Sequence, residues 1–366
     1  MTRHAERRGR VAALIRDAGL DAAAFVPGPS FDYLTGLRFP LMERPTLLFV
    51  TGKAGMLAIM PELERLKWGS AFPDTDTFYW QDSDGFEDAF AAAAGALGAA
   101  AVGVEGGRMR MFEYDALRRH LKDGEVRNAD ADLQALRIAK DEDEIASLSR
   151  AIGISETALG ETLDEVRAGD TEGSIATLLK SRMLAHGSEG FGFDPIVLAG
   201  AHAANPHGTP GDAPLRPGDA LLIDFGARID GYSADITRTF FCEHVSDRHA
   251  EIYEIVRAAN ALGRRIAGPG VTAHDLDTAV TGSLQSSSFA HMIVHKTGHG
   301  LGLDVHEAPQ VMVGNHQTLE PGYVITVEPG LYGAGDVGIR IEDDVTITED
   351  GSRSLTSFAR ELRLIG

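Results

Sequence analysis

The chain has 366 residues, of which 43% are hydrophobic, and its 54 acidic against 34 basic residues give a formal net charge of −20. Domains usually run to about 100–200 residues, so we expect two of them. The acidic excess argues against binding to nucleic acid or to an anionic membrane surface, because both attract clustered lysine and arginine. It is compatible with a cation site, although solubility alone also explains an acidic surface.

Cysteine usage and the opening segment both favour an ordinary cytoplasmic protein. The one cysteine, Cys242, excludes an intrachain disulfide and a cysteine-based zinc site, and fits a reducing compartment. The opening residues lack the apolar core of a signal peptide, and Val11, Leu14, Ile15 and Ala18 recur at helical spacing. No apolar stretch approaches the length of a membrane span.

The first third of the chain alternates strand and helix signals. Short apolar runs predict strands at residues 22–26, 46–50 and 56–60. Residues 84–97 predict a helix that begins at an aspartate and ends before Gly98. This alternation predicts a small α/β domain.

The composition changes at a strongly charged stretch between Asp130 and Glu144, which leads into a long helical segment. We therefore predict an N-terminal domain of residues 1–134 and a C-terminal domain of residues 135–366. The second domain is predicted to contain a helical stretch at 247–267 and strands in the segments 220–229, 232–241, 323–330 and 337–348.

Two aspartates, Asp224 and Asp235, interrupt apolar strands on either side of an Asp230-Gly231 turn signal. If these two turn residues form the centre of a hairpin, Asp224 lies opposite Thr237 and Asp235 is its diagonal neighbour on the same face. Two carboxylates on one buried face repel each other unless one is protonated or a cation lies between them. The alternative is that one is buried and hydrogen-bonded while the other is solvated.

Two glutamates, Glu328 and Glu342, likewise interrupt runs of β-branched residues. The segment between them is long enough for a wide hairpin, so their strands can be neighbours. Arg340 shares a strand face with Glu342 and could orient acidic ligands. The alternative is a simple Glu–Arg ion pair at a sheet edge.

Three histidines, His295, His299 and His306, alternate with glycines that permit a close approach of the backbone to a ligand. Their spacing is not the helical HExxH pattern, which disfavours a zincin. Carboxylate-rich, histidine-poor sites suit manganese, cobalt or iron better than a sulfur- and nitrogen-rich zinc site does. Bridging carboxylates suit two metal ions about 3.5–4 Å apart, and hydrolysis is the natural chemistry of such a site.

The segments DFGARIDGYSADITRTF, GHGLGLDVHE, ITVEPGLY and GIRIEDD resemble the signature of the pita-bread metallopeptidases (family M24). That family includes Xaa-Pro aminopeptidases, prolidases and methionine aminopeptidases. The resemblance implies two divalent metal ions, with manganese as first choice and cobalt, iron or zinc as alternatives. The ligands that it implies are Asp224, Asp235, His299, Glu328 and Glu342, with Asp235 and Glu342 bridging.

The same resemblance implies substrate contacts for His207, His306 and His295. It also extends to the first domain, where FDYLTGL and ERPTLLFV resemble the creatinase-like N-terminal domain that methionine aminopeptidases lack. The complete ligand set argues against creatinase and against non-catalytic relatives. The implied fold is α+β: a pita-bread catalytic domain preceded by a smaller α/β creatinase-like domain.

The implied activity is hydrolysis of an Xaa-Pro peptide bond by a hydroxide that bridges the two metals. We expect Glu328 to move the proton and His306 to stabilise the oxyanion, with Arg340 supporting the catalytic set. Tyr332 or Phe191 would line an apolar pocket for the proline ring. The expected substrate is a small peptide with proline at its second position.

A dipeptidase must also bind the free carboxylate of the second residue, for which arginine is well suited. In some prolidases an arginine follows the motif matched by VHEAP, but this chain has Gln310 there. We predict that Arg38 or Arg44 closes the site of the partner in a homodimer; the alternative is that both are plain surface charges. We expect an Xaa-Pro dipeptidase, with an Xaa-Pro aminopeptidase acting on longer peptides, or a non-catalytic pita-bread binding protein, as the alternatives.

Overall fold

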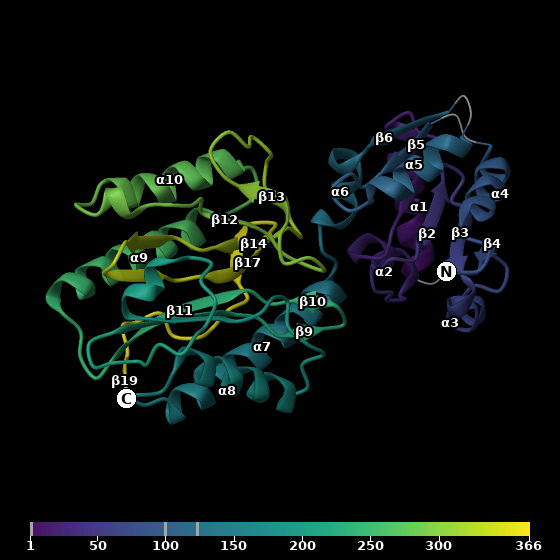
Figure 1. Cartoon of the computed structure of the whole chain (residues 1–366). Coiled ribbons are helices and arrows are strands. Elements are labelled where there is room, and N and C mark those ends of the chain that lie inside the picture. Colours follow the sequence, from purple (N-terminus) through teal and green to yellow (C-terminus); the bar gives the residue numbers. More distant parts are fainter. Residues whose placement is uncertain (1–2, 99–100, 122–123) are drawn as a thin grey trace. The chain divides into compact units, whose positions relative to one another are not determined.

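The computed structural model describes residues 3–98, 101–121 and 124–366 and divides into two compact units, Met1–Arg137 and Ile138–Gly366. Unit 1 has a single sheet and unit 2 has several, and each unit has its own hydrophobic core (Figure 1). The domain boundary predicted between residues 134 and 135 falls within the helix at which the units divide, and stays a prediction.

Unit 1 is a small α/β domain, as the alternation of its sequence predicted. Its sheet has the order β4-β3-β2-β1-β5-β6, with β1 parallel to β5 and antiparallel to β2. Its strands are β1 (Ala22–Phe25), β2 (Leu47–Thr51), β3 (Met56–Pro61), β4 (Asp76–Trp80), β5 (Ala101–Val104) and β6 (Glu125–Asn128). Its helices are α1 (Arg3–Asp17), α2 (Pro29–Thr35), η1 (Glu62–Glu64), α3 (Arg65–Ala71), α4 (Glu87–Leu97), α5 (Met111–His120) and α6 (Asp130–Ile138).

The helix predicted over 84–97 begins later than the sequence suggested. The N-cap of α4 is Phe86, which makes no capping hydrogen bond, while the backbone N–H of Asp84 bonds to Gln81 in a turn. The predicted aspartate cap at Asp84 was therefore wrong. The predicted end is confirmed, because Gly98 adopts the left-handed conformation with φ 55°.

Unit 2 begins with α7, and a capping box explains why it starts where it does. The Asp141 side chain accepts a hydrogen bond from the Glu144 backbone N–H at 3.0 Å, and Glu144 accepts one from the Asp141 N–H at 2.9 Å. Two backbone donors that the first helical turn leaves free are thereby satisfied. The charged stretch that marked the change in composition thus contains the start signal of this helix.

The second unit contains two main sheets, with the orders β19-β11-β8-β7 and β13-β12-β14-β17-β18. Its helices are α7 (Glu142–Glu165), α8 (Glu172–Ala185), η2 (Gly200–Ala204), α9 (Asp247–Ile266), α10 (Ala273–Gln285) and η3 (Ala290–Met292). Its first strands are β7 (Ile196–Ala199), β8 (Ala220–Phe225), β9 (Arg228–Ile229), β10 (Tyr232–Ser233), β11 (Ile236–Cys242), β12 (Gly298–Gly300) and β13 (Glu307–Val311). Its later strands are β14 (Val324–Val327), β15 (Gly330–Gly333), β16 (Val337–Arg340), β17 (Asp343–Thr348), β18 (Gly351–Ser354) and β19 (Leu364–Ile365).

Figure 1 shows α9 and α10 on one side of these strands, and α7 and α8 on the other. One core joins α9 and α10 to the five-stranded sheet, through residues such as Val256, Val280 and Ile325. The other joins α7 and α8 to the four-stranded sheet, through residues such as Leu159 and Ile223. The two sheets of unit 2 are therefore each covered by a pair of helices on one face.

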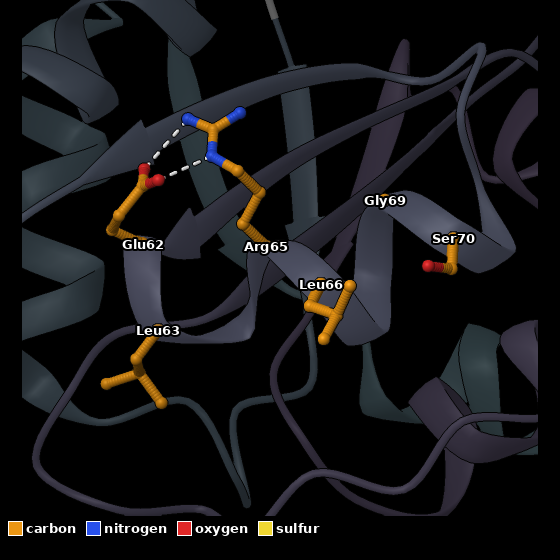
Figure 2. A pocket seen from close by; sticks show the side chains of 6 residues that line it. All are labelled: Glu62, Leu63, Arg65, Leu66, Gly69 and Ser70. Carbon is orange, nitrogen blue, oxygen red and sulfur yellow. Dashed lines mark hydrogen bonds and ion pairs between the residues drawn. The ribbon is translucent and has the colours of Figure 1, made fainter.

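A shallow hollow of about 470 Å³ lies on the surface of unit 1 (Figure 2). Leu63 and Leu66 beside it are 62% and 83% exposed, and Arg65 pairs with Glu62 at 2.5 Å. An exposed ion pair of this kind contributes little to stability, and these groups form no enclosed site. Across the described residues, no helix is both long enough and apolar enough to cross a membrane.

Candidate metal centre

The hairpin of β8 and β11 brings two aspartates together. Its turn is centred on Asp230 and Gly231, whose φ angles are 51° and 88°, and Asp224 pairs with Thr237. The register predicted from the sequence is therefore confirmed. Asp224 is 8% exposed and Asp235 4%, so the alternative in which one of them is solvated is wrong.

A glycine allows the chain to pass close to itself beside Asp235. A Cβ atom at Gly226 would lie 1.7 Å from the carbonyl oxygen of Ala234, a distance that no side chain tolerates. The Asp235 backbone N–H donates to Asp344 Oδ2 at 3.2 Å, which connects the residue directly before β11 to β17. Glycine at position 226 is thus a condition for placing the Asp235 carboxylate.

The other sheet supplies a histidine and two glutamates. His299 lies in β12, Glu328 directly follows β14, and Glu342 directly precedes β17. Strands β14 and β17 pair in antiparallel register, which confirms the prediction that the strands of the two glutamates can be neighbours. At Gly300 a Cβ would lie 2.1 Å from the carbonyl oxygen of Ala308, so glycine is needed for this close approach of β12 and β13.

The side chains from both sheets converge on one place, and we call them the cage: Asp224, Asp235, His299, Glu328 and Glu342. Ligand atoms of Asp224, Asp235 and Glu342 all lie within 4.8 Å of one another. The same limit holds for His299, Glu328 and Glu342. Glu342 is common to both groups, which is the arrangement that two neighbouring cations would require.

The hydrogen bonding of His299 shows that the cage fits a cation. Its Nδ1 donates to the carbonyl oxygen of Gly300 at 3.1 Å, so Nε2 carries the lone pair. This Nε2 lies 3.4 Å from Glu328 Oε1 and 3.6 Å from Asp235 Oδ2. A lone pair that faces two carboxylate oxygens is repelled, whereas a metal ion would bind all three atoms.

Two further observations support this fit. Asp224 Oδ1 is buried and has no hydrogen-bond partner among the described residues, which is costly for a carboxylate. Burial, followed by the charges of Glu342 and Asp224, raises the pKa of Asp235 well above its ordinary value. Burial and the neighbouring carboxylates Glu328 and Asp224 do the same to the pKa of Glu342. Divalent cations would remove this repulsion.

Burial also shifts the pKa values of the other two cage residues, His299 and Glu328, in opposite directions. Burial lowers the pKa of His299 to about 3, with a further contribution from His306, so its imidazole is neutral at pH 7. Burial also raises the pKa of Glu328 to about 8, although Arg340 acts in the opposite direction. A neutral imidazole is the form that binds a metal ion.

Arg340 is a buried residue that supports the cage carboxylates through hydrogen bonds. It is 3% exposed, and its Nη2 donates to Asp224 Oδ2 at 2.5 Å, its Nε to Thr237 Oγ1 at 2.9 Å and its Nη1 to Tyr332 Oη at 2.6 Å. Thr237 Oγ1 in turn donates to Glu342 Oε2 at 2.6 Å. Arg340 is therefore a buried support of the carboxylates, and its interpretation as a simple Glu–Arg ion pair at a sheet edge was wrong.

His295 joins this network through Tyr332. Its Nδ1 bonds to the carbonyl oxygen of Lys296 at 2.8 Å, and its Nε2 pairs with Tyr332 Oη at 2.8 Å. Burial, with the charge of Arg340, lowers the pKa of His295 to about 4. Both ring nitrogens already have partners, and the roles of His295 and Tyr332 toward substrate stay predictions.

The other predicted residues are less enclosed. His306 is exposed, and its ring centroid lies 4.0 Å from that of His299. His207 is also exposed, and Phe191 is half-buried beside Lys180. The substrate contacts predicted for His207, His306 and Phe191 stay predictions.

The two arginines predicted to close the partner's site belong to unit 1. Arg44 forms ion pairs with Asp82 and Glu43, both at 2.7 Å, and Arg38 lies 3.7 Å from Asp32. Their role toward a second copy of the chain stays a prediction.

Sequence reasoning missed several supporting groups. Asp344 lies two residues beyond Glu342, and the period of two along a strand could have placed it on the same face. A buried ion pair joins Lys140 Nζ to Glu307 Oε2 at 3.0 Å, directly beside His306. No signal in the sequence links these last two residues, because they lie far apart in the chain and meet only after folding.

Comparisons with known proteins agree with this geometry. A sequence model described as metallopeptidase family M24 matches residues 146–349, and one described as the creatinase/prolidase N-terminal domain matches residues 7–139. The chain is 32% identical to the Xaa-Pro dipeptidase of Pyrococcus horikoshii, over 94% of this chain and 94% of that protein. The first matched region lies within unit 2, and the second covers most of unit 1 and ends two residues beyond it.

Solved structures show the same similarity over the whole chain. A recombinant prolidase from Thermococcus sibiricus superposes with a TM-score of 0.94 at 29% identity and covers 100% of both chains. An X-Pro aminopeptidase from Thermotoga maritima superposes with a TM-score of 0.86 at 32% identity, over 98% of this chain and 99% of that one.

Proposed function

This chain belongs to metallopeptidase family M24, and from that premise we propose that it is an Xaa-Pro dipeptidase that depends on two divalent metal ions. The observation that carries the proposal is the lone pair of His299 Nε2, which faces Asp235 and Glu328 at 3.6 and 3.4 Å. The similarity to Xaa-Pro dipeptidases and prolidases supports the choice of substrate.

The cage residues would hold the two ions. The oxygen-rich set of four carboxylates and one imidazole favours manganese, with cobalt, iron or zinc as alternatives. When bound, such ions lower the pKa of a water molecule and polarise a carbonyl group. Arg340 and Thr237 keep the carboxylates of Asp224 and Glu342 in place for this purpose.

The chain's own groups would then guide the proton and the substrate. The Glu328 side chain is 16% exposed, and its carboxylate would take the proton and return it to the proline nitrogen. His306, exposed beside His299, can donate from its ring to the oxygen of the scissile carbonyl. The free α-amine of the substrate would meet the acidic cage, which restricts cleavage to the first peptide bond.

The experiment is hydrolysis of Ala-Pro by protein that is first stripped with a chelator and then reloaded with manganese. We expect activity to return with metal in the wild type and to stay absent in His299→Ala and Glu328→Gln. His316→Ala, at an exposed histidine outside the cage, is the matched control and keeps its activity. If either cage variant retains near-normal metal-dependent hydrolysis, the proposal is wrong.

An Xaa-Pro aminopeptidase acting on longer peptides is the second candidate. The similarity to the Thermotoga maritima enzyme supports it. Ala-Pro and Ala-Pro-Gly distinguish the two candidates, because only the first presents the proline carboxylate. A higher kcat/KM for the tripeptide contradicts the dipeptidase assignment.

We also propose that the protein is a cytoplasmic homodimer. The single buried Cys242 supports a reducing compartment, and the resemblance to pita-bread peptidases supports the dimer. Sedimentation velocity measures the assembly directly, and a monomer at micromolar concentration contradicts this part of the proposal.

A further inference from the structure

A peptidase that prefers dipeptides must recognise the free carboxylate of its substrate. Bound divalent ions would offset the four carboxylates of the cage, but the substrate carboxylate lies one residue from the scissile bond and carries a charge of its own. Burying that charge without a partner is costly, so a cation beside the site favours productive binding. Gln310, next to the histidine segment, is neutral and cannot supply that charge.

Lys296 is a cation close to the strand that carries His299. It follows His295 and precedes β12, and its Nζ donates a hydrogen bond to Gln310 Oε1. Gln310 is itself fixed, because its Nε2 donates to the carbonyl oxygen of Glu307 at 3.0 Å and it pairs with His299 in the register of β12 and β13. The ammonium is thereby held at the strand that carries the cage histidine.

The backbone around Lys296 is also fixed on both sides. Its carbonyl oxygen accepts from His295 Nδ1 at 2.8 Å. The next residue, Thr297, donates from its N–H and its hydroxyl to the buried Asp277 carboxylate at 2.9 and 2.7 Å. A cation on a backbone held this firmly loses less conformational entropy when it binds a ligand.

The charge of Lys296 is not neutralised by a carboxylate. Within the parts of the chain that the structure describes, no acidic group forms an ion pair with its Nζ, and the partner that holds it is the neutral Gln310. The buried cations described in unit 2 differ, because Lys140 pairs with Glu307, Arg238 with Asp343 and Arg340 with Asp224. A half-buried ammonium with a neutral partner retains its attraction for an anion.

The ammonium lies in the same segment as groups that would contact substrate, directly after His295 and three residues before His299. The alternative cations already have partners: Arg340 bonds to Asp224, Thr237 and Tyr332, Arg44 pairs with Asp82 and Glu43, and Arg38 lies 3.7 Å from Asp32.

We propose that the Lys296 ammonium, held by Gln310, binds the free carboxylate of a dipeptide and so determines the preference for dipeptides over longer peptides. The proposal rests on the peptidase function proposed above. It assigns Lys296 to substrate selection and leaves the hydrolytic step to the cage.

The experiment compares Ala-Pro with its carboxamide, Ala-Pro-NH₂, on manganese-loaded full-length protein. Hydrogen bonds between charged groups are worth roughly 1.5–3 kcal/mol, so we expect Lys296→Met to raise KM for Ala-Pro about 10–100-fold. KM for the carboxamide and kcat for both substrates should stay within about threefold, since the removed charge has no partner in the amide. Lys296→Arg should keep most of the preference.

Further variants make the test specific. Gln310→Glu gives the ammonium an internal carboxylate partner and should weaken the preference without removing the lysine. Lys53→Met, at an exposed lysine of unit 1, is the matched control and should change neither KM. Arg38→Gln and Arg44→Gln test the competing cations in the same assay.

The outcomes distinguish a failure of the proposed peptidase function from a failure of the assignment of Lys296. If the wild type hydrolyses neither substrate, the peptidase function itself is wrong. If it hydrolyses both but Lys296→Met changes their KM values equally or not at all, only the assignment of Lys296 is overturned. The assignment is also overturned if Arg38→Gln or Arg44→Gln removes the carboxylate preference instead.

Discussion

Two neighbouring acidic residues, Glu342 and Asp343, lie in opposite electrostatic surroundings. Glu342 belongs to the cage, where burial and other carboxylates raise its pKa well above the ordinary value. Asp343 is 0% exposed, and burial alone would raise its pKa too, but Arg238 and Arg360 outweigh burial and the pKa ends below its ordinary value. Arg264 adds a third guanidinium at 3.2 Å from Asp343 Oδ2.

The difference between Asp343 and Glu342 distinguishes a carboxylate that stabilises the fold from one that serves a function. Around Asp343 the fold supplies internal cations, so the carboxylate is neutralised as soon as the chain folds. In the cage Arg340 pairs with Asp224, and among the described residues no lysine or arginine forms an ion pair with Asp235, Glu328 or Glu342, which leaves their charge for an external cation. Uncompensated buried charge is costly to a fold, so its survival in one place indicates a function there.

Removing a cage carboxylate should separate activity from stability most clearly. We expect Glu342→Gln to lower kcat/KM for Ala-Pro by about 10³-fold or more, because metal ligation supplies several kcal/mol of transition-state stabilisation. The metal-free variant should nevertheless unfold at the same or a higher urea concentration than the metal-free wild type, since one repelling charge is gone. A marked loss of stability in chelator would contradict the assignment of Glu342 to an uncompensated cage.

At Asp343 we expect the opposite result, a marked loss of stability in the metal-free protein. Asp343→Asn leaves Arg238, which is 1% exposed, without its carboxylate, and breaking a buried pair typically costs about 3–5 kcal/mol. Urea unfolding in chelator measures this loss. Asp344→Asn is the matched control, because burial raises the pKa of Asp344 well above its ordinary value, and we expect a much smaller loss there. Equal losses at the two positions would remove the contrast between a paired and an unpaired carboxylate.

The buried pair of Lys140 and Glu307 offers a second neutralised site with which to compare the cage. Lys140→Met should destabilise the protein by about 3 kcal/mol, because it leaves the Glu307 carboxylate buried without a cation. The double variant Lys140→Met/Glu307→Gln should recover part of this, since the glutamine oxygen can still accept the Asp304 N–H that Glu307 now binds at 2.9 Å. A double-mutant cycle in urea measures the coupling, and additive losses would show that the pair is not coupled.

The smallest effect is expected at Glu105 in unit 1, where a carboxyl lies buried outside the cage. Burial raises its pKa, and the hydrogen bond from Ser30 only partly offsets this. A carboxyl whose pKa is raised in the folded state makes the folded protein less stable as the pH rises. The loss begins near the pKa of the unfolded state, about 4.3, and continues until the pH passes the pKa of the folded state. Each pKa unit of difference between the folded and unfolded states corresponds to about 1.4 kcal/mol in the free energy of unfolding.

Glu105→Gln should therefore match the wild type in stability near pH 4 and exceed it increasingly toward pH 7. Urea midpoints measured across this range check the slope. Glu125→Gln, at an exposed glutamate of the same unit, should show no such trend. A wild-type advantage that grows with pH would mean that Glu105 is stabilised as the anion.

Much of the candidate site was open to prediction because it depends on local rules. The Asp230-Gly231 turn and the period of two along a strand were enough to place Asp224 opposite Thr237, and the structure has this register. The ordered motifs around His299, Glu328 and Glu342 were enough to indicate the family. The start of α4 was misplaced because Asp84 is used in a preceding turn, a choice that competes locally with capping.

The sequence by itself determined the alternation of elements, the hairpin register and the order of the acidic and histidine motifs, because each depends on residues close together in the chain. Only the tertiary structure decided which charges are compensated. Arg340 meets Asp224, Arg238 meets Asp343 and Lys140 meets Glu307 across long sequence separations, while Lys296 is left with the neutral Gln310. The physical reason is that charge compensation depends on distance and burial in space, and neither is encoded in the spacing of residues along the chain.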